Sequence, residues 1–371
     1  MTWRQYLQSR TRQPEFLWRM VIWILAAGIA LGFVAEKTWQ PQQTDAAAEV
    51  QLNQAWKDSQ QLAEQGQWWR LWWSLPPAVY HRFHGVGPLA LSIIAGCCWF
   101  LFLWQALRAP GWRDIRLWAA LMAIACGVLS IWPTHFFSLW QEYRWNLHNS
   151  QELIPGLRYW VLGVGLREEV AKLLCVLPLI PVLMRVRDEL TALLVSACVG
   201  LGFAVVENVN YFAGAGGIAV MGRFLTANPF HMTLTGLAGL MLYRVLRNPR
   251  GWGSHALSIF GILIFAHGLY DAFIALPDLV DYGIFNTIIF ALVVYQFFHE
   301  LRELRKNQRD TVSLSANFLF GVSVLTASTF VYLSARFGMS IAFDALASGV
   351  FGLAVMVYLF LREMPDTMVS V

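Results

Sequence analysis

Long apolar runs alternate with short polar segments along most of the 371-residue chain. A helix of roughly 20 residues crosses a hydrocarbon core of about 30 Å, and these runs have about that length. They lie at about residues 17–35, 87–107, 117–137, 159–184, 190–212, 223–246, 256–276, 281–299, 315–334 and 340–361. The pattern predicts an all-α polytopic membrane protein with about ten transmembrane helices. Eight or nine spans remain the alternative, if one run lies in the interface or re-enters the membrane.

Composition excludes an ordinary soluble protein. The chain is 57% hydrophobic and 13% charged, whereas soluble domains carry about 25% charged residues. The net charge of +4 is small and spread through short loops, so it indicates membrane topology and not a nucleic-acid surface. The cysteines lie in apolar runs without C-x-x-C spacing, which predicts buried reduced thiols rather than a disulfide or metal framework. They are Cys97, Cys98, Cys126, Cys175 and Cys198.

Arginine and lysine are concentrated in alternate loops, and this bias sets the predicted orientation. The basic residues concerned are Arg4, Arg10, Arg12, Arg19, Arg108, Arg113, Arg116, Arg185, Arg187, Arg244, Arg247, Arg250, Arg302, Arg305, Lys306, Arg309 and Arg362. Of the intervening short loops, 277–280 has no basic residue and 335–339 has only Arg336. The alternation predicts that both termini are cytoplasmic, in a bacterial inner (cytoplasmic) membrane. The first run is too long for a signal-peptide core, so it is predicted to be an uncleaved anchor.

The segment at about 36–86 is the largest extracytoplasmic piece and is rich in tryptophan. Paired tryptophans one helical turn apart, in the sequence Trp68-Trp69-Arg70-Leu71-Trp72-Trp73, predict an amphipathic helix at the lipid headgroups. A substrate-contact surface is the alternative. The H-x-x-H pair His81 and His84 is interpreted as part of a wet interfacial loop rather than a metal site.

Polar residues interrupt four consecutive apolar runs in the middle of the chain. They are Glu168-Glu169-x-x-Lys172, Phe203-x-x-x-Glu207-Asn208, His231 and His267-x-x-x-Asp271. An ionisable group at the centre of a transmembrane helix costs about 2.5–3.5 kcal/mol or more, so such groups are rare and usually face an internal cavity. Several of them on neighbouring spans therefore predict one functional site.

The predicted topology places these residues at one depth. At 1.5 Å per residue, they lie roughly 7–14 Å below the outer boundary of the membrane, although their helices alternate in direction. Glu168 and Lys172 share a helix face at spacing i, i+4, as do His267 and Asp271. Pro178 and its neighbour Pro181 are expected to kink the fourth span just below the site.

Buried acids beside a cation and imidazoles suit the addition of water to an amide carbonyl. Glu168 and Glu207 could hold and deprotonate water, while histidines donate to a developing oxyanion. The same side chains also suit a metal, with Glu207, His231, His267 and Asp271 as the candidate ligands and Zn as the possible ion. A transporter or channel that uses the acids and histidines as a proton or cation relay is the alternative function. No H-E-x-x-H or G-x-G-D motif is present.

At these motifs the chain resembles the PrsW family of intramembrane endopeptidases, relatives of the CAAX prenyl endopeptidases and the wider Abi/CPBP superfamily. The family pattern is E-E-x-x-K, F-x-x-x-E-N, a lone His and H-x-x-x-D on successive membrane helices. All four elements occur here in the same order. The resemblance covers about residues 155–276, which we interpret as a four-helix catalytic core. Residues 1–154 and 277–371 would each supply three flanking transmembrane helices.

The resemblance implies a peptidase, glutamic-type or metalloprotease, that cleaves a membrane-anchored protein, such as an anti-sigma factor, near the extracytoplasmic face. It implies that Glu168 and Glu207 activate water and that His267 and Asp271 stabilise the oxyanion. Related prenyl endopeptidases carry His and Asn where this chain has Glu207 and Asp271, which makes a metal more plausible here. The glutamic-type reading requires no cofactor. The remaining expected site residues are Glu169, His231 and the supporting Lys172, Phe203 and Asn208.

Overall fold

The structure is a computed structural model, and it describes residues 3–39, 46–80, 83, 85–108, 111–305, 312–348 and 350–364. Every regular element in these ranges is helical, as the apolar pattern predicts. The N-terminal elements are α1 (Trp3–Arg10), α2 (Pro14–Thr38), α3 (Ala46–Glu64), α4 (Trp68–Val79), α5 (Val86–Leu107) and α6 (Ile115–Trp145). The central elements are α7 (Leu153–Arg158), η2 (Tyr159–Gly165), α8 (Leu166–Val176), η3 (Leu177–Leu179), α9 (Ile180–Val186), α10 (Glu189–Gly214), α11 (Val220–Leu225) and α12 (Ala227–Arg247). The C-terminal elements are α13 (Pro249–Ala275), α14 (Pro277–Val280), α15 (Ile284–Leu304), α16 (Leu314–Phe337), α17 (Met339–Ala347) and α18 (Val350–Glu363).

The described residues form seven helices that are long and apolar enough to cross a membrane, or up to eight if a bent pair is one span. The seven are α2, α5, α6, α10, α13, α15 and α16. The bent pair is α17 with α18, which meet at 58°. The protein is therefore an integral membrane protein of the predicted all-α class, but the count of ten spans is not confirmed.

Two of the predicted spans differ from regular apolar helices, and both carry site residues. The run at 159–184 folds as a π-helix (η2), an α-helix (α8), a 3-10 turn (η3) and a further α-helix (α9). The 3-10 turn contains Pro178, near which a kink was expected. The run at 223–246 is divided between α11 and α12, and α12 carries Asn228, His231 and Arg244 within its length. These polar residues lower its hydropathy below that of an ordinary span.

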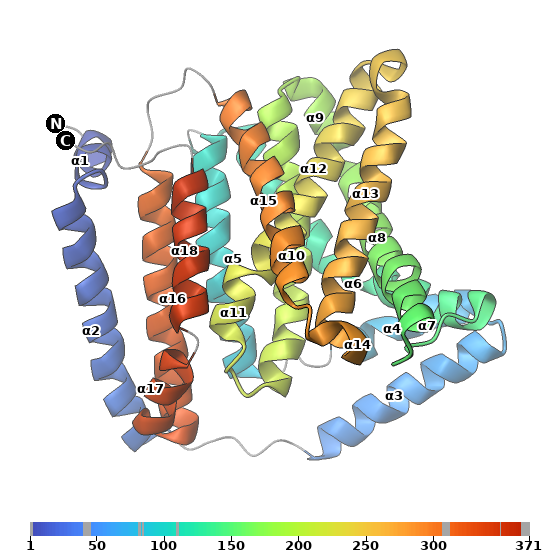
Figure 1. The fold of residues 1–371 in the computed structure, drawn as a ribbon, viewed down its shortest axis with the longest axis horizontal. Helices are drawn as coiled ribbons and strands as arrows, with labels where there is room; N and C mark the ends of the chain where they lie inside the picture. Colours follow the sequence, from blue (N-terminus) through green and yellow to red (C-terminus); the bar gives the residue numbers. More distant parts are fainter. Residues whose placement is uncertain are drawn as a thin grey trace.

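The core surrounds α10, which is buried along almost its whole length between α6 and α12 (Figure 1). Glycines allow this close packing. A Cβ on Gly200 would overlap the backbone carbonyl oxygen of His231, and one on Gly202 would overlap that of Ile124. Because the backbones touch at these points, α10 fixes the height of His231 relative to its own Glu207.

A second layer packs beside this core (Figure 1). Helix α2 lies along α16, where a Cβ on Gly28 would overlap Ala327 and one on Gly32 would overlap the ring of Phe330. Small residues at this spacing permit close helix approach within a membrane. This layer is separate from the residues of the four motifs.

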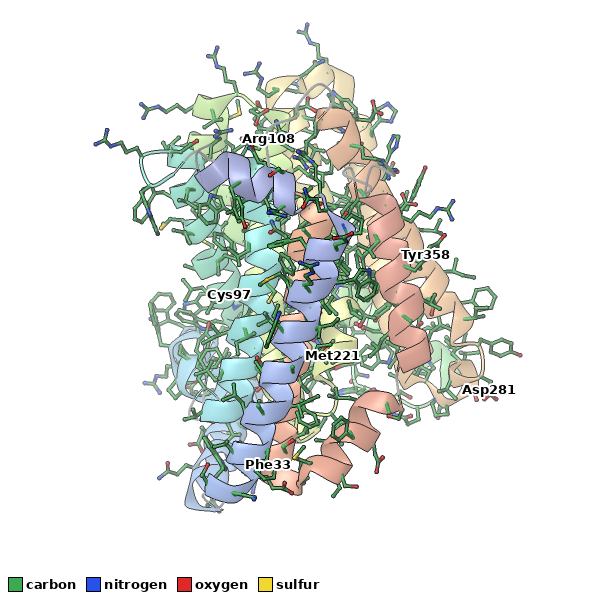
Figure 2. The ribbon with its side chains drawn as sticks, turned by 90° about the vertical axis from the view of Figure 1, so that its left-hand side faces the viewer. Phe33, Cys97, Arg108, Met221, Asp281 and Tyr358 are labelled. Atoms are coloured by element: carbon green, nitrogen blue, oxygen red, sulfur yellow. The ribbon has the colours of Figure 1, made fainter. Side chains whose placement is uncertain are left out.

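Several described basic residues of the alternate loops follow helix ends that lie at one end of the bundle, among them Arg108 after α5 and Arg187 after α9 (Figure 1). Figure 2 shows Arg108 at this end and Phe33 and Asp281 at the other. Helix α1 and the last turn of α18 lie at the same end as Arg108 (Figure 1). Cys97 projects from the surface of the bundle (Figure 2), so the expectation that all five thiols are buried is wrong for this residue.

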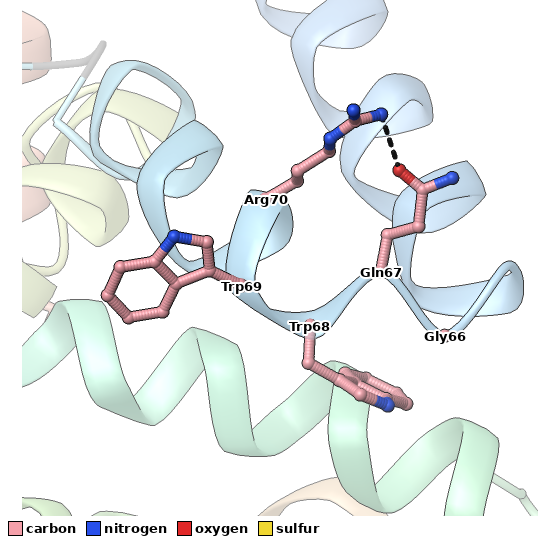
Figure 3. A pocket seen from close by; sticks show the side chains of 5 residues that line it. All are labelled: Gly66, Gln67, Trp68, Trp69 and Arg70. Carbon is pink, nitrogen blue, oxygen red and sulfur yellow. Dashed lines mark hydrogen bonds between the residues drawn. The ribbon is translucent and has the colours of Figure 1, made fainter.

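Helices α3 and α4 form a hairpin at the opposite end, against α6. Trp72 stacks on Trp132 with ring centroids 4.7 Å apart, and Trp132 Nε1 donates to the carbonyl oxygen of Trp72 at 2.8 Å. Trp69 is 73% exposed, whereas Trp68 packs edge-on against Phe136 of α6 with ring centroids 6.2 Å apart. Figure 3 shows the two rings pointing in different directions. A shallow hollow of about 580 Å³ lies between the two helices, at Gly66 to Arg70. The tryptophans of α4 thus serve two purposes, with one face packed and the other exposed.

Candidate active site

The first motif is positioned by close packing of η2 and α8 against α13. A Cβ on Gly165 would contact the carbonyl oxygen of Ile264, and one on Gly268 would overlap the backbone at Val161. π-Helical turns are rare and occur frequently at functional sites. Here the π-helix ends one turn before Glu168, so the backbone contact brings this turn of α8 next to His267.

Glu169 and Lys172 form a buried ion pair beneath His267. Lys172 Nζ lies 2.7 Å from Glu169 Oε1, and His267 Nδ1 lies 2.7 Å from the same oxygen. The relative accessibility of Glu169 is 1% and that of Lys172 is 0%. Because a carboxylate oxygen accepts, the proton of the His267 hydrogen bond lies on Nδ1. This contact fixes the orientation of the His267 ring.

The other ring nitrogen of His267 faces two further carboxylates. His267 Nε2 lies 3.5 Å from Glu168 Oε2 and 3.4 Å from Asp271 Oδ2. Glu168 Oε2 is buried and has no hydrogen-bond partner among the described residues. Both carboxylates therefore lie close to His267 Nε2, and Glu168 Oε2 also lies 3.6 Å from Lys172 Nζ.

His231 connects this group to Glu207. Its Nδ1 lies 2.9 Å from Lys172 Nζ, and its Nε2 lies 2.9 Å from Glu207 Oε2. An ammonium group only donates and a carboxylate only accepts, so the neutral ring carries its proton on Nε2. Both nitrogens of His231 are thus hydrogen-bonded, whereas in His267 only Nδ1 is.

Arg223 is a site residue that the sequence analysis missed. It lies on the short helix α11, and its guanidinium contacts Glu207 Oε2 at 2.5 Å and Asn208 Oδ1 at 2.6 Å. The same group lies 3.7 Å from the centroid of the Tyr211 ring. Asn208, in turn, donates to the Oδ1 of Asn228 at 2.5 Å. In the predicted topology this arginine is only the first residue of the span at 223–246. Nothing in the apolar pattern indicates that a short helix directs its side chain toward Glu207.

Aromatic rings close the site on its buried side. Lys172 Nζ lies 4.3 Å from the centroid of the Phe203 ring, and Phe203 packs edge-on against His231 at 5.0 Å. The ring of Phe230 packs edge-on against His267 at 5.8 Å. Phe203 is thus a support for the cation and imidazole, as its position one turn before Glu207 suggests.

A cavity of about 220 Å³ is lined by the carboxylates of Glu168 and Glu207, the two acids expected to activate water. Glu168 and Arg167 line it from α8, and Glu207 lines it from α10. The remaining lining residues are Ile131, Thr134, His135 and Ser138 of α6 and Phe203, Asn210 and Tyr211 of α10. At about 30 Å³ per water molecule, the cavity has room for roughly seven waters.

A group of three side chains in this site could hold a metal ion. Glu168, His231 and His267 each offer one ligand atom, and these atoms lie within 4.8 Å of one another. Glu168 was not among the metal ligands expected from the sequence, whereas His231 and His267 were. Glu207 lies outside the group, and its Oε2 is held by Arg223 and His231.

The structure brings together all of the residues expected at the site. Glu168, Glu169, Lys172, Glu207, His231, His267 and Asp271 form one continuous chain of polar contacts. Phe203 lies in direct contact with Lys172 of this chain, and Asn208 is joined to it through Arg223, which also contacts Glu207. The histidines His81 and His84 fall outside the described residues, so their interpretation stays a prediction.

Residues 115–298 match the model of a protein family described as PrsW family intramembrane metalloprotease. The matched part begins at the first residue of α6 and ends within α15, so it contains all four motifs and Arg223. No curated protein matches the chain, and no solved structure does.

Proposed function

The chain belongs to the PrsW family of intramembrane proteases and is a peptidase, and from this premise we propose that it cleaves membrane-anchored proteins within the cavity lined by Glu168 and Glu207. The observation that carries the proposal is this cavity, which has carboxylates from two helices on one wall and space for water and a peptide group. An anti-sigma-factor-like protein is the proposed class of substrate. The transporter alternative has no support from the family match.

Glu168 is the proposed general base. Its carboxylate lies at the cavity, and its Oε2 faces His267 Nε2 without a hydrogen-bond partner among the described side chains. A carboxylate held in this position can orient a water molecule and take its proton as the water attacks the substrate carbonyl. Glu169 and Lys172 position the catalytic groups, since Glu169 orients His267 and Lys172 offsets the charge of both acids.

Glu207 is the proposed second carboxylate of the reaction. Its contacts with Arg223 and with His231 hold it as an anion at a fixed place on the cavity wall. From that place it can accept a hydrogen bond from the attacking water or from the leaving amine. Where the His267 ring is doubly protonated, its Nε2 becomes a donor and can stabilise the oxyanion. Asp271 would orient this ring, and in its protonated form it would itself donate to the oxyanion.

The residues at the site also fit the metal ion that the family description implies, and zinc is the proposed ion. Glu168, His231 and His267 would hold it, since they offer a carboxylate oxygen and two imidazole nitrogens within 4.8 Å of one another. Asp271 Oδ2 lies close by, 3.4 Å from His267 Nε2. Glu169 on Nδ1 of the same ring supplies the carboxylate–histidine arrangement usual behind a metal ligand. Four acids lie at the site against three cations, which are Lys172, Arg223 and the Arg167 of the cavity wall. A zinc ion held here would polarise the substrate carbonyl and acidify bound water.

The orientation in the membrane follows from charge. The end of the bundle with Arg108, α1 and the last turn of α18 is proposed to be cytoplasmic, in a bacterial inner membrane. The site would then open in the extracytoplasmic half. Reporter fusions after α14 and after α15, the first expected outside and the second inside, would test the assignment.

Cleavage of single-span test substrates in proteoliposomes tests the function. Wild type is compared with Glu168→Gln and Glu207→Gln, each with and without a chelator, and Glu15→Gln on the exposed face of α2 serves as the matched control. We expect both site variants to lose at least about 100-fold in rate while the control is unchanged. Loss on chelation with recovery in zinc supports the metal, and activity retained in chelator supports the glutamate-only route. Equal cleavage by Glu168→Gln and wild type would contradict the proposal.

A further inference from the structure

One wall of the cavity has no part in the water activation proposed above. It is formed by α6, where Thr134, His135 and Ser138 face the same space as Glu168 and Glu207. None of these three side chains contacts the polar chain of the four motifs in any hydrogen bond of the described residues. A polar wall opposite the reacting groups is where the substrate itself would bind.

His135 has a defined tautomer on this wall. Its Nδ1 lies 2.9 Å from the carbonyl oxygen of Ile131. A carbonyl oxygen only accepts, so Nδ1 carries the proton and Nε2 of the neutral ring is an acceptor. Among the described residues, the His135 ring makes its one hydrogen bond through Nδ1, which leaves Nε2 for another donor. The cavity therefore contains an unused hydrogen-bond acceptor of fixed orientation.

The ring of His135 is also held from outside its helix. Trp56 of α3 packs edge-on against it with ring centroids 5.7 Å apart. Trp56 in turn packs with the apolar cluster beneath the α3–α4 hairpin, which includes Leu71 and Leu75. A hairpin at the end of the bundle thus sets the position of a side chain in the cavity.

A peptide substrate presents the complementary group. A transmembrane helix must unwind before its backbone can reach Glu168, because a helix of about 10 Å diameter does not fit a cavity of 220 Å³. Each unwound residue leaves a backbone N–H without a partner, which is costly away from water. A neutral acceptor in the cavity would satisfy one such N–H regardless of the side chains of the substrate.

We propose that His135 is a substrate-binding residue, whose Nε2 accepts a hydrogen bond from a backbone N–H of the unwound substrate segment. Trp56 is the positioning residue that holds the ring for this contact. The proposal rests on the protease function proposed above and adds the recognition of extended backbone on the α6 wall.

The test uses the full-length protein in proteoliposomes and a single-span test substrate. His135→Phe removes the acceptor and keeps a ring, whereas His135→Gln keeps an acceptor at similar reach. His255→Phe, at an exposed position in the first turns of α13, is the matched control. We expect His135→Phe to raise KM about tenfold with little change in kcat, and His135→Gln to recover most of the loss. Trp56→Ala is expected to raise KM to a smaller extent.

A modified substrate gives an independent readout. N-methylation of single backbone amides around the scissile bond should raise KM for wild type at one position, and His135→Phe should not respond to methylation there. Melting temperatures of all variants are measured in the same detergent to exclude unfolding.

The outcomes separate the two proposals. If wild type cleaves, Glu168→Gln does not, and His135→Phe has the KM of His255→Phe, the role of His135 is wrong and the protease function stands. The same conclusion follows if the loss in His135→Phe lies wholly in kcat. If wild type cleaves no membrane-anchored substrate, the proposed function fails, and the role of His135 fails with it.

Discussion

Glu169 Oε1 lies 2.7 Å from His267 Nδ1 and 2.7 Å from Lys172 Nζ, so one carboxylate oxygen holds both an imidazole and an ammonium group. Glu169 itself is 1% exposed and does not line the cavity. Its neighbour Glu168 lies at the cavity with its oxygen facing the other nitrogen of His267. Two adjacent acids thus have different roles, because the helix directs one to the cavity and the other to the imidazole behind it.

Glu169→Gln should lower kcat/KM about 10- to 100-fold, in the range found when a carboxylate behind a functional histidine is removed. The glutamine oxygen can still accept from Nδ1, so the fold should persist. The measurement is cleavage kinetics with a melting curve for each variant, and Glu15→Gln, on an 88% exposed side chain, is the control. Wild-type kinetics for Glu169→Gln would contradict a positioning role.

Lys172→Met should destabilise the protein by about 3–5 kcal/mol, since it leaves buried carboxylates without their cation. The thermal midpoint in detergent measures the loss, and Lys57→Met on the exposed face of α3 should leave it unchanged. Adding Glu169→Gln to Lys172→Met should recover part of the stability, because one of the unpaired charges is removed. A double variant less stable than Lys172→Met alone would show that charge pairing is not the cause.

Arg223→Gln should reduce cleavage at least about tenfold, because Glu207 loses a charge-assisted hydrogen bond at a partly buried position. The cleavage rate of Arg223→Lys should lie between those of wild type and Arg223→Gln. An ammonium group cannot reproduce the guanidinium fork that reaches both Glu207 and Asn208. Arg336→Gln, at an exposed position of α16, is the control. An Arg223→Gln variant as active as this control would show that α11 contributes nothing to the active site.

Gly200→Ala should lower both stability and activity, because its Cβ would overlap the carbonyl oxygen of His231 and displace that helix turn. A displacement near 1 Å can cost about 100-fold in rate. Gly253→Ala on α13 has nothing within 4 Å of the added carbon. This control should stabilise the protein by about 0.5–1 kcal/mol as an ordinary helix substitution. Melting curves and cleavage rates of the two alanine variants distinguish close packing from glycine loss in general.

Trp69 is expected to lie at the level of the lipid headgroups, since it projects from the exposed face of α4 beside an aromatic cluster packed on α6. A nitroxide on Trp69→Cys, in a variant without the five native cysteines, should be more accessible to a polar relaxer than to oxygen dissolved in the hydrocarbon core. The same label at Ile262 of α13, 64% exposed on the bundle surface, should give the opposite preference. Equal hydrocarbon exposure at both positions would place α4 within the membrane.

The sequence predicts that the residues of the four motifs lie close together, as they do in the structure, and the reason is physical. Charged and polar side chains at matching levels of neighbouring helices have few stable arrangements other than contact with one another. The spacing of Glu168 and Lys172 and that of His267 and Asp271 are therefore sufficient to place each pair on one face. Contacts between helices, such as His231 between Lys172 and Glu207, depend on rotations that the periodicity does not determine.

Arg223 was missed because the sequence between α10 and α12 looks like a turn followed by one helix. A continuous helix from 223 would place this arginine at the outer boundary, away from Glu207. In the structure, α11 ends at Leu225 and α12 begins at Ala227, and this break lets Arg223 reach back to the acid. The π-helix before Glu168 was missed for a related reason, since it depends on the close packing of Gly165 against α13.

The pairing of Glu207 with Arg223 also bears on how the chain enters the membrane. The two residues are separated by 16 positions and lie on helices that follow one another, so their contact requires no distant part of the chain. Inserted singly, α10 would carry an unpaired acid into lipid and the next segment an unpaired arginine. If the two segments are inserted together as a hairpin, Glu207 and Arg223 pair as they enter the lipid. Biogenesis of this protein should therefore proceed with α10 and α11–α12 leaving the insertion machinery as one unit, before α13 supplies His267.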